Sequence, residues 1–181
     1  MEYFDILDEN GNLTGTKKER SKVHQDGDWH RAVHIWIIND KNELLLQRRS
    51  PNKDSHPNMW DISSAGHLSA GDESLTGAMR EISEELGINV QAEQLEYLFT
   101  LKSASRYTET FINNEFDDIY LICLNLDLSQ IQVQEDEISE VKFVYYKDLE
   151  QMVKNKAEGL LIHQEEYERL FEILHQRLDE K

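Results

Sequence analysis

The sequence predicts an α/β fold in which a mixed β-sheet is covered by α-helices. Runs rich in Val, Ile and Trp alternate with amphipathic segments of helical period, and the first of these runs are close enough to form hairpins. The 181 residues contain no Pro/Gly/Ser-rich linker and no internal repeat. A chain of this length suits one hydrophobic core, so we expect a single domain over residues 1–181.

The first half of the chain has mostly β-type patterns. The turn at residues 9–12 and the polar stretch at residues 39–42 each lie between two apolar runs, which predicts two hairpins. A polar loop follows at residues 51–57, and the next apolar run ends at Gly66. Strands are therefore predicted at residues 3–7, 13–16, 30–38, 43–48 and 59–65.

The clearest helix is predicted at residues 73–86. Its apolar residues fall on one stripe, Asp72 can cap its first turn, and Gly87 stands where a C-terminal glycine belongs. Patterns further along the chain predict strands at residues 96–103, 116–126 and 141–146 and helices at residues 147–155 and 163–178.

Composition restricts the classes of function. The net charge of −17 argues against a general nucleic-acid-binding protein, because affinity for phosphate backbones is built from clustered Lys and Arg. A small polyphosphate bound through divalent cations remains compatible with this surplus of carboxylates. The only cysteine, Cys123, lies in an apolar run and is expected to be a buried structural thiol.

Sequence patterns also bear on the location and assembly of the protein. No apolar window approaches the length of a membrane span, and the first residues lack a signal-peptide pattern, so we expect a cytoplasmic protein without membrane contact. Homodimers are common among soluble proteins, but no apolar stripe in this sequence demands one.

Three glutamates on the predicted helix indicate a metal site. Glu81, Glu84 and Glu85 are spaced i, i+3 and i+4, so their carboxylates converge beside the apolar stripe. Like charges at this spacing destabilise an isolated helix, and a divalent cation removes the conflict. Mg²⁺ prefers such hard oxygen ligands, with Mn²⁺ as an alternative. The competing interpretation is a solvated acidic face in which Arg80 makes an ordinary ion pair with Glu84.

The segment around this helix, residues 66–88, resembles the Nudix box. After Gly66 come five residues and Asp72, then seven residues and Arg80-Glu81, then Glu84-Glu85 and finally Gly87-Ile88. Asp72 stands where the pattern has Glu, and every other fixed position matches. The resemblance implies the Nudix fold, an α/β/α sandwich, and hydrolysis of a small molecule that contains a diphosphate. Asp72 is expected to weaken the support of the helix without abolishing activity, or to act as a plain N-cap.

Carried over to this chain, the resemblance assigns roles within the box. Glu81, Glu85 and the Gly66 carbonyl would bind the metal, and Glu84 would be a further ligand or would orient the attacking water. Arg80 would hold the glutamates in place.

A longer stretch, residues 5–146, resembles the isopentenyl diphosphate isomerase-like branch of the Nudix family. The similarity lies in the first hairpin, His24 and residues 29–33, 44–49, 59–60 and 64–67. The catalytic cysteine of the isomerases would fall at Ala65, which cannot transfer a proton, so the resemblance favours hydrolysis over isomerisation. A non-catalytic nucleotide-binding Nudix module is a second alternative. The intact Arg80, Glu81, Glu84 and Glu85 oppose it, whereas the replacement of Glu by Asp72 favours it.

The isomerase resemblance also singles out His24, His30 and His67, which match metal ligands of that branch. They are candidates for a second metal site with Glu115, but Asn113 stands where a further glutamate ligand would be. Packing and loop hydrogen bonds are therefore the favoured role of the histidines. Glu115 is also the favoured candidate for a further catalytic carboxylate, with Glu109, Asp117 and Asp118 as nearby alternatives.

Other side chains are candidates for substrate contacts. Arginine forks suit phosphates, and an aromatic ring can stack on the organic part of a substrate. These criteria select Arg48, Arg49, Arg106 and Lys53 for phosphate and Tyr107 for the organic part. His34 is expected in the core or in a pocket, whereas His56, His163 and His175 belong to no pattern.

Overall fold

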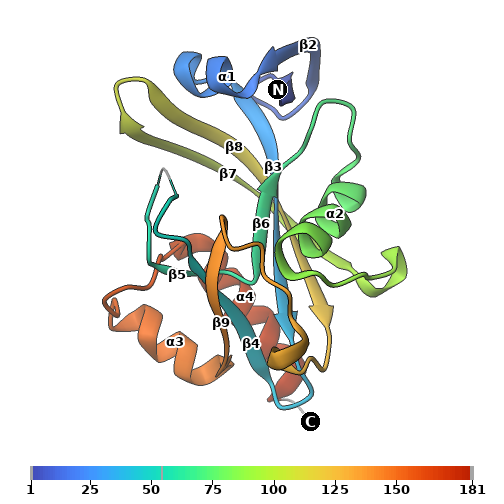
Figure 1. Cartoon of the computed structure of the whole chain (residues 1–181), viewed down its shortest axis with the longest axis vertical. Helices are drawn as coiled ribbons and strands as arrows, with labels where there is room; N and C mark the ends of the chain where they lie inside the picture. The colour runs from blue at the N-terminus through green and yellow to red at the C-terminus, as the bar shows by residue number, and fades with distance from the viewer. Residues whose placement is uncertain (1, 54, 180–181) are drawn as a thin grey trace.

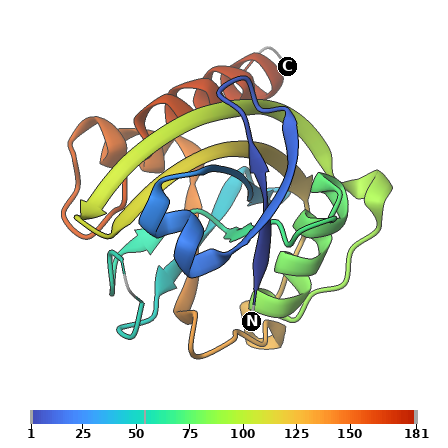
Figure 2. The same cartoon turned by 90° about the horizontal axis from the view of Figure 1, so that it is seen from above.

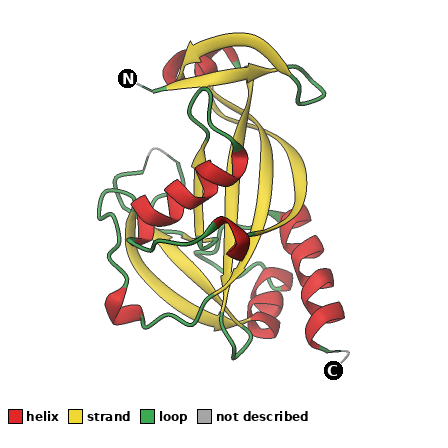
Figure 3. Cartoon of the chain, turned by 90° about the vertical axis from the view of Figure 1, so that its right-hand side faces the viewer, coloured by secondary structure: helices red, strands yellow, loops and turns green. Residues whose placement is uncertain are grey.

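A computed structural model describes residues 2–53 and 55–179. Within them nine strands form one mixed sheet with helices on both faces (Figures 1 and 3). The strands are β1 (Tyr3–Leu7), β2 (Leu13–Glu19), β3 (Trp29–Ile38), β4 (Glu43–Arg49), β5 (Trp60–Asp61), β6 (Ser64–His67), β7 (Glu96–Thr108), β8 (Phe111–Cys123) and β9 (Ile138–Tyr145). The helices are α1 (Arg20–Asp26), α2 (Ser74–Leu86), α3 (Tyr146–Lys154) and α4 (Gln164–Leu178), with short 3₁₀ helices η1 (Ala92–Gln94) and η2 (Leu128–Gln130).

Strand β3 is the centre of the sheet. It pairs with β8 in parallel and with β1, β4 and β6 antiparallel, while β7 and β9 extend the sheet from β8 and β4. Strands β3 and β4 pair at Ile38 and Leu44, near the C-terminal end of β3. Strand β6 pairs with β3 nearer its N-terminal end, at residues 32–35. The sheet therefore opens between β3 and β4, with β6 placed beside the opening.

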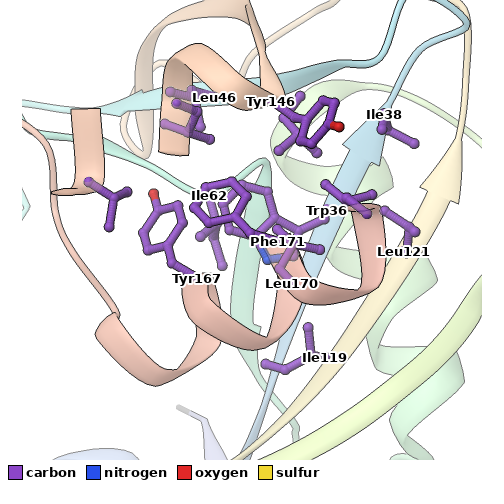
Figure 4. Packing of buried hydrophobic residues seen from close by; sticks show 14 of the residues in the cluster. Trp36, Ile38, Leu46, Ile62, Ile119, Leu121, Tyr146, Tyr167, Leu170 and Phe171 are labelled. Carbon is purple, nitrogen blue, oxygen red and sulfur yellow. The ribbon is translucent and has the colours of Figure 1, made fainter. Parts of the chain in front are cut away.

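Alternation along the strands divides the hydrophobic core into two layers. Ile35 and Ile37 of β3 pack on the α2 side, with Ala78, Ile82 and Leu86 of the helix stripe. Trp36 packs on the other side, against Tyr167, Leu170 and Phe171 of α4 (Figure 4). Each large apolar side chain buried in this way contributes about 1.5–3 kcal/mol, so the two layers fix both helices to the sheet.

The predicted fold class, a mixed sheet between helices, is confirmed. Helix α1 was not predicted, because Val23 is its single buried apolar residue and no helical apolar stripe marks it. Strand β7 continues past the predicted residue 103 to Thr108, and β8 begins at Phe111, before the predicted residue 116. The outer halves of these strands are polar, so a search for apolar runs does not detect them. Figure 2 shows the long β7–β8 ribbon curving past α1, with α4 along its outer side.

Two local predictions are corrected. Helix α2 begins at Ser74 with Glu73 at the N-cap position, and Asp72 makes no cap hydrogen bond; Gly87 ends the helix with a left-handed φ of 67°, as expected. Cys123 is exposed, because it is the last residue of β8 and its side chain lies beyond the core layer. Among the described residues, no helix combines the length and apolarity needed to cross a membrane.

Candidate active site

A cavity of about 710 Å³ occupies the opening of the sheet. Its wall combines β6 and α2 with the outer halves of β7 and β8, the loop after β4 and the segment that enters α4. These parts are far apart in sequence, and each carries charged or hydrogen-bonding side chains into the wall. Segments far apart in the sequence thus contribute buried polar groups to one cavity, among them Asp61, Glu81, Glu85, Glu115, Asp117 and Glu166.

Helix α2 turns two of its three candidate glutamates into this cavity as buried groups. Glu81 is 8% exposed and Glu85 is 5% exposed. Burial raises the pKa of Glu81 to about 7, against the opposing charge of Arg80, and raises the pKa of Glu85 to about 8. The Glu85 Oε2 accepts hydrogen bonds from Ser64 Oγ (2.6 Å) and from the Ala65 amide (3.2 Å). Glu85 is thus held against β6 while its carboxylate lacks a cationic partner of its own.

Gly66 lies directly against the Glu81 carboxylate. A Cβ atom at this position would lie 2.1 Å from Glu81 Cδ and within 2.4 Å of both carboxylate oxygens. No side chain larger than hydrogen fits there without displacing Glu81. Glycine therefore lets the β6 backbone and the helix carboxylate approach each other closely.

Arg80 links the glutamates of α2 to the backbone of β6. Its Nη1 lies 2.8 Å from Glu81 Oε1 and 3.1 Å from Glu84 Oε2, and its Nη2 donates a hydrogen bond to the His67 carbonyl (3.0 Å). Asp72 lies 3.7 Å from the same guanidinium group, so it supports Arg80 at longer range. Glu84 is at the rim, with its side chain 54% exposed, and also makes the i,i+4 pair of the competing interpretation.

His24, His30 and His67 come together beside the cavity, and His67 lines it. Their candidate ligand nitrogens all lie within 4.8 Å of one another. Phe4 stacks on the rings of His30 and His67, and the Nε2 atoms of His24 and His30 have no hydrogen-bond partner. Burial lowers the pKa of His24 to about 4 and also lowers that of His67, which favours neutral imidazoles.

Two carboxylates of β8 face the same cavity. Glu115 Oε1 lies 2.9 Å from His67 Nε2 and 3.5 Å from His30 Nε2, and Asn113 donates a hydrogen bond to its other oxygen. Asp117 projects from the same strand face two residues later. Its Oδ1 is buried without a hydrogen-bond partner, and burial raises the pKa of Asp117 to about 7.

The predicted substrate contacts divide into two groups. Arg49, Lys53 and Tyr107 line the cavity. Arg48 lies outside its lining, because adjacent strand residues point to opposite faces; it bonds the Asn58 carbonyl (3.1 Å) and lies 3.6 Å from Glu140. Arg106 likewise does not line the cavity.

Sequence patterns missed a group of residues at the α4 end of the cavity. His163 bonds Asp61 there, and Glu166 of α4 bonds His34. His56 also lines this end. No local motif marks these contacts, because each of the two pairs joins residues more than 100 positions apart.

The NUDIX domain family matches residues 28–164, which contain most of the cavity lining, including the β6 and α2 segments. The chain belongs to the Nudix family. An uncharacterized Nudix hydrolase of Clostridium acetobutylicum is 35% identical over 91% of this chain and 82% of its own length. Nudix hydrolase 3 of Arabidopsis thaliana is 43% identical over 97% of this chain, although the chain spans 24% of that protein.

Isomerases are also among the relatives of this Nudix protein. An isopentenyl-diphosphate Delta-isomerase of Serratia proteamaculans is 33% identical over 66% of the chain and 65% of its own length. The predicted resemblance to the Nudix family and to its isomerase-like branch is thus confirmed. The higher identity to proteins named Nudix hydrolases places the chain among the hydrolases.

Solved structures support the fold. A Deinococcus radiodurans protein covers 93% of this chain and 98% of its own, with a TM-score of 0.69 at 20% identity. The NUDIX domain of Shewanella oneidensis NrtR, crystallised with ADP ribose, covers 80% of this chain and 87% of its own, with a TM-score of 0.59 at 18% identity. At these identities the similarity concerns the fold alone.

Proposed function

We propose that this Nudix hydrolase cleaves the diphosphate of a small organic molecule with a divalent cation bound by Glu81, Glu85 and the Gly66 carbonyl. The observation that carries the proposal is the burial of Glu81 and Glu85, one helical turn apart, on the cavity wall beside Gly66. Mg²⁺ is the expected cation, with Mn²⁺ as an alternative.

The donor set suits such a cation. Two carboxylates buried one turn apart are unfavourable when ionised, as their raised pKa values indicate. A divalent cation offsets both the burial and the mutual repulsion, and carboxylate and carbonyl oxygens are the ligands that Mg²⁺ prefers. The proposal therefore accounts for an arrangement that is otherwise unfavourable for folding.

The protein groups around the cation have distinct tasks. A bound cation neutralises charge on the phosphate oxygens and lowers the pKa of a bound water. Arg80 ties the carboxylates of α2 to the β6 backbone, so it fixes their positions. Glu84, at the exposed rim, is proposed as a further ligand or as the acceptor that orients water, and Glu115 as an acceptor on the opposite wall.

Substrate binding is proposed for three residues of the lining. Arg49 and Lys53 would meet phosphate oxygens, and Tyr107 would contact the organic part. The position of Arg48 outside the lining gives it no such role.

A second metal site is proposed at His24, His30 and His67, with Glu115 as the acidic ligand. Its support is the 4.8 Å grouping of the nitrogens together with two ring nitrogens that have no hydrogen-bond partner. Imidazole and carboxylate ligands suit Mn²⁺ or Zn²⁺. This arrangement is also what favours isomerisation as the alternative function, and Ala65 opposes it.

The test is a substrate panel of nucleoside diphosphate derivatives and prenyl diphosphates, assayed with Mg²⁺ and with EDTA. Release of phosphate or pyrophosphate that requires Mg²⁺ and disappears in Glu85→Gln is the expected result. Glu140→Gln, which alters an exposed carboxylate of β9, is the matched control and should retain activity.

The products distinguish the alternatives. Conversion of isopentenyl diphosphate to its allylic isomer, without hydrolysis, would replace the hydrolase with an isomerase. Nucleotide binding without any turnover across the panel would favour the non-catalytic module.

A further inference from the structure

We propose that His34 and His163 form a phosphate-binding subsite at the α4 end of the cavity, separate from the cation site on α2. The inference rests on the proposed function in one respect, since it takes the ligand to be the second phosphate of a diphosphate substrate. It is carried by two imidazole–carboxylate pairs that lie next to each other in the cavity wall.

His34 is held by a carboxylate from the far end of the chain. Its Nδ1 lies 2.8 Å from Glu166 Oε2, and the other oxygen of Glu166 accepts a hydrogen bond from Trp36 Nε1 (2.8 Å). Glu166 is 2% exposed, so two donors fix a buried carboxylate and thereby orient the imidazole ring. The remaining nitrogen of His34, Nε2, is 3.9 Å from Asp117 Oδ1, which is too long for a hydrogen bond.

His163 is held in the same manner by a different carboxylate. Its Nε2 lies 3.0 Å from Asp61 Oδ1, and Arg49 Nη1 lies 3.1 Å from the other oxygen of Asp61. Asp61 is 3% exposed, whereas the side chain of His163, which lines the cavity, is 32% exposed. The Nδ1 atom of His163 is therefore the nitrogen left for a ligand.

The two rings lie next to each other, with their centroids 5.5 Å apart and their planes tilted by 59°. Burial alone would lower both pKa values, but the carboxylates outweigh it: the pKa of His34 rises to about 10, and that of His163 is also raised. Two imidazolium rings at this separation repel each other, and each has one N–H not used by its carboxylate. A phosphate oxygen placed at these N–H groups accepts charge-assisted hydrogen bonds and removes the repulsion.

The charges of the cavity are distributed unevenly. The α2 end carries Glu81, Glu84 and Glu85, which suit a cation. At the α4 end the cationic side chains His34, His163 and Arg49 gather, each paired with a buried carboxylate, Glu166 or Asp61. The two helices lie on opposite faces of the sheet (Figure 3), so the two ends of the cavity are built by different elements. A diphosphate in this cavity would have one phosphate at the cation and the other at the imidazolium pair.

The experiment measures binding of inorganic pyrophosphate to the full chain in EDTA, which removes any contribution from a metal site. Histidine side-chain ¹⁵N resonances of the wild-type protein and titration calorimetry are the two readouts. The variants are His163→Gln and Asp61→Asn. His175→Gln is the control, because His175 of α4 is also paired with carboxylates, Glu150 of α3 and Asp179, but does not line the cavity.

Pyrophosphate is expected to shift the imidazole resonances of His34 and His163. The affinity should fall on the order of tenfold or more in His163→Gln, since a charge-assisted hydrogen bond is lost, and should be unchanged in His175→Gln. Unmoved resonances of both histidines, or wild-type affinity in His163→Gln, would overturn the proposal.

The outcome is distinguishable from that of the hydrolase proposal. Mg²⁺-dependent hydrolysis with the same KM in wild type and His163→Gln would leave the hydrolase standing and refute the subsite. Histidine shifts with pyrophosphate, without turnover of any diphosphate, would support the subsite and refute the hydrolase.

Discussion

Replacing Glu85 by Gln is expected to stabilise the metal-free protein while it abolishes metal-dependent activity. Glu85 is 5% exposed, and burial raises its pKa from 4.5 to about 8. The glutamine amide oxygen can still accept the hydrogen bonds that Ser64 and the Ala65 amide now donate to the carboxylate. The substitution therefore removes the charge with little change in packing.

The sign and the size of the effect follow from this pKa. Because the folded-state pKa is above the unfolded value, the folded protein holds the Glu85 proton more tightly, and this contribution to stability is complete below pH 4.5. It is lost as the pH rises through about 8, where the ionised group opposes folding. The pKa difference corresponds to roughly 5 kcal/mol. Burial of the glutamine amide offsets part of it, so we expect a gain of about 1–3 kcal/mol in the free energy of unfolding.

Urea unfolding in EDTA at about pH 5 and about pH 8.5 measures this gain. The advantage of Glu85→Gln should be largest at the higher pH and small at the lower pH. Mg²⁺ should stabilise the wild-type protein and have little effect on the variant, since ligands stabilise only the state that binds them. A variant no more stable than wild type at the higher pH in EDTA would refute the reasoning.

Three further predictions concern other parts of the site. Gly66→Ala should raise the Mg²⁺ concentration needed for half-maximal activity by about tenfold or more, because a Cβ would lie 2.1 Å from Glu81 Cδ; activity titrated with Mg²⁺ measures this. Asp118→Ala should lower the free energy of unfolding by about 2–4 kcal/mol, because the Arg31 guanidinium, 2.7 Å away, loses its buried partner; urea unfolding measures this. Asn113→Glu should tighten Mn²⁺ binding at the histidine cluster by about tenfold, since it adds a carboxylate ligand, and calorimetry measures this.

Each of these changes has a control or a contrary outcome. Gly77→Ala places a Cβ 2.0 Å from Leu68 Cδ2, a comparable clash in the α2 core layer, and should leave the Mg²⁺ requirement unchanged. An equal rise in both glycine variants would break the link between Gly66 and the metal. A loss below about 1 kcal/mol in Asp118→Ala would show that its hydrogen bonds are replaced by water. Asn113→Gln, which adds length without charge, should not tighten Mn²⁺ binding.

Local rules were sufficient for the Nudix helix. The apolar stripe and Gly87 predicted a helix over residues 73–86, and the structure has α2 at Ser74–Leu86 with Gly87 in the left-handed conformation. Helix position and phase depend on residues within one or two turns, so sequence spacing determines which side each glutamate occupies. The prediction erred only at the start, where Asp72 does not cap the helix.

Long-range pairs could not be predicted in this way. His163 and Asp61 are 102 positions apart, and His34 and Glu166 are 132 positions apart. No periodicity joins such residues, because their contact depends on how α4 packs against the sheet through Trp36 and its neighbours. The same reason explains why Arg49 lines the cavity and Arg48 does not. Both side chains suit phosphate, but the face of β4 that points into the cavity depends on how β4 pairs with its neighbours.

Four buried carboxylates of the protein, Asp61, Glu166, Glu85 and Asp117, differ in whether a cationic side chain contacts them. Asp61 and Glu166 each contact a cationic side chain at 2.8–3.1 Å, and those partners outweigh burial and hold the pKa of both carboxyls below the usual range. Glu85 and Asp117 have no cationic partner within hydrogen-bond distance, and burial raises their pKa values to about 8 and about 7. A buried carboxylate without a partner opposes folding, so its presence calls for a ligand that supplies the missing positive charge. Asp117 lies 3.9 Å from the imidazole of His34, which supplies positive charge on that side of the cavity. Glu85 lines the cavity as part of the Nudix box, where a divalent cation would make its burial favourable.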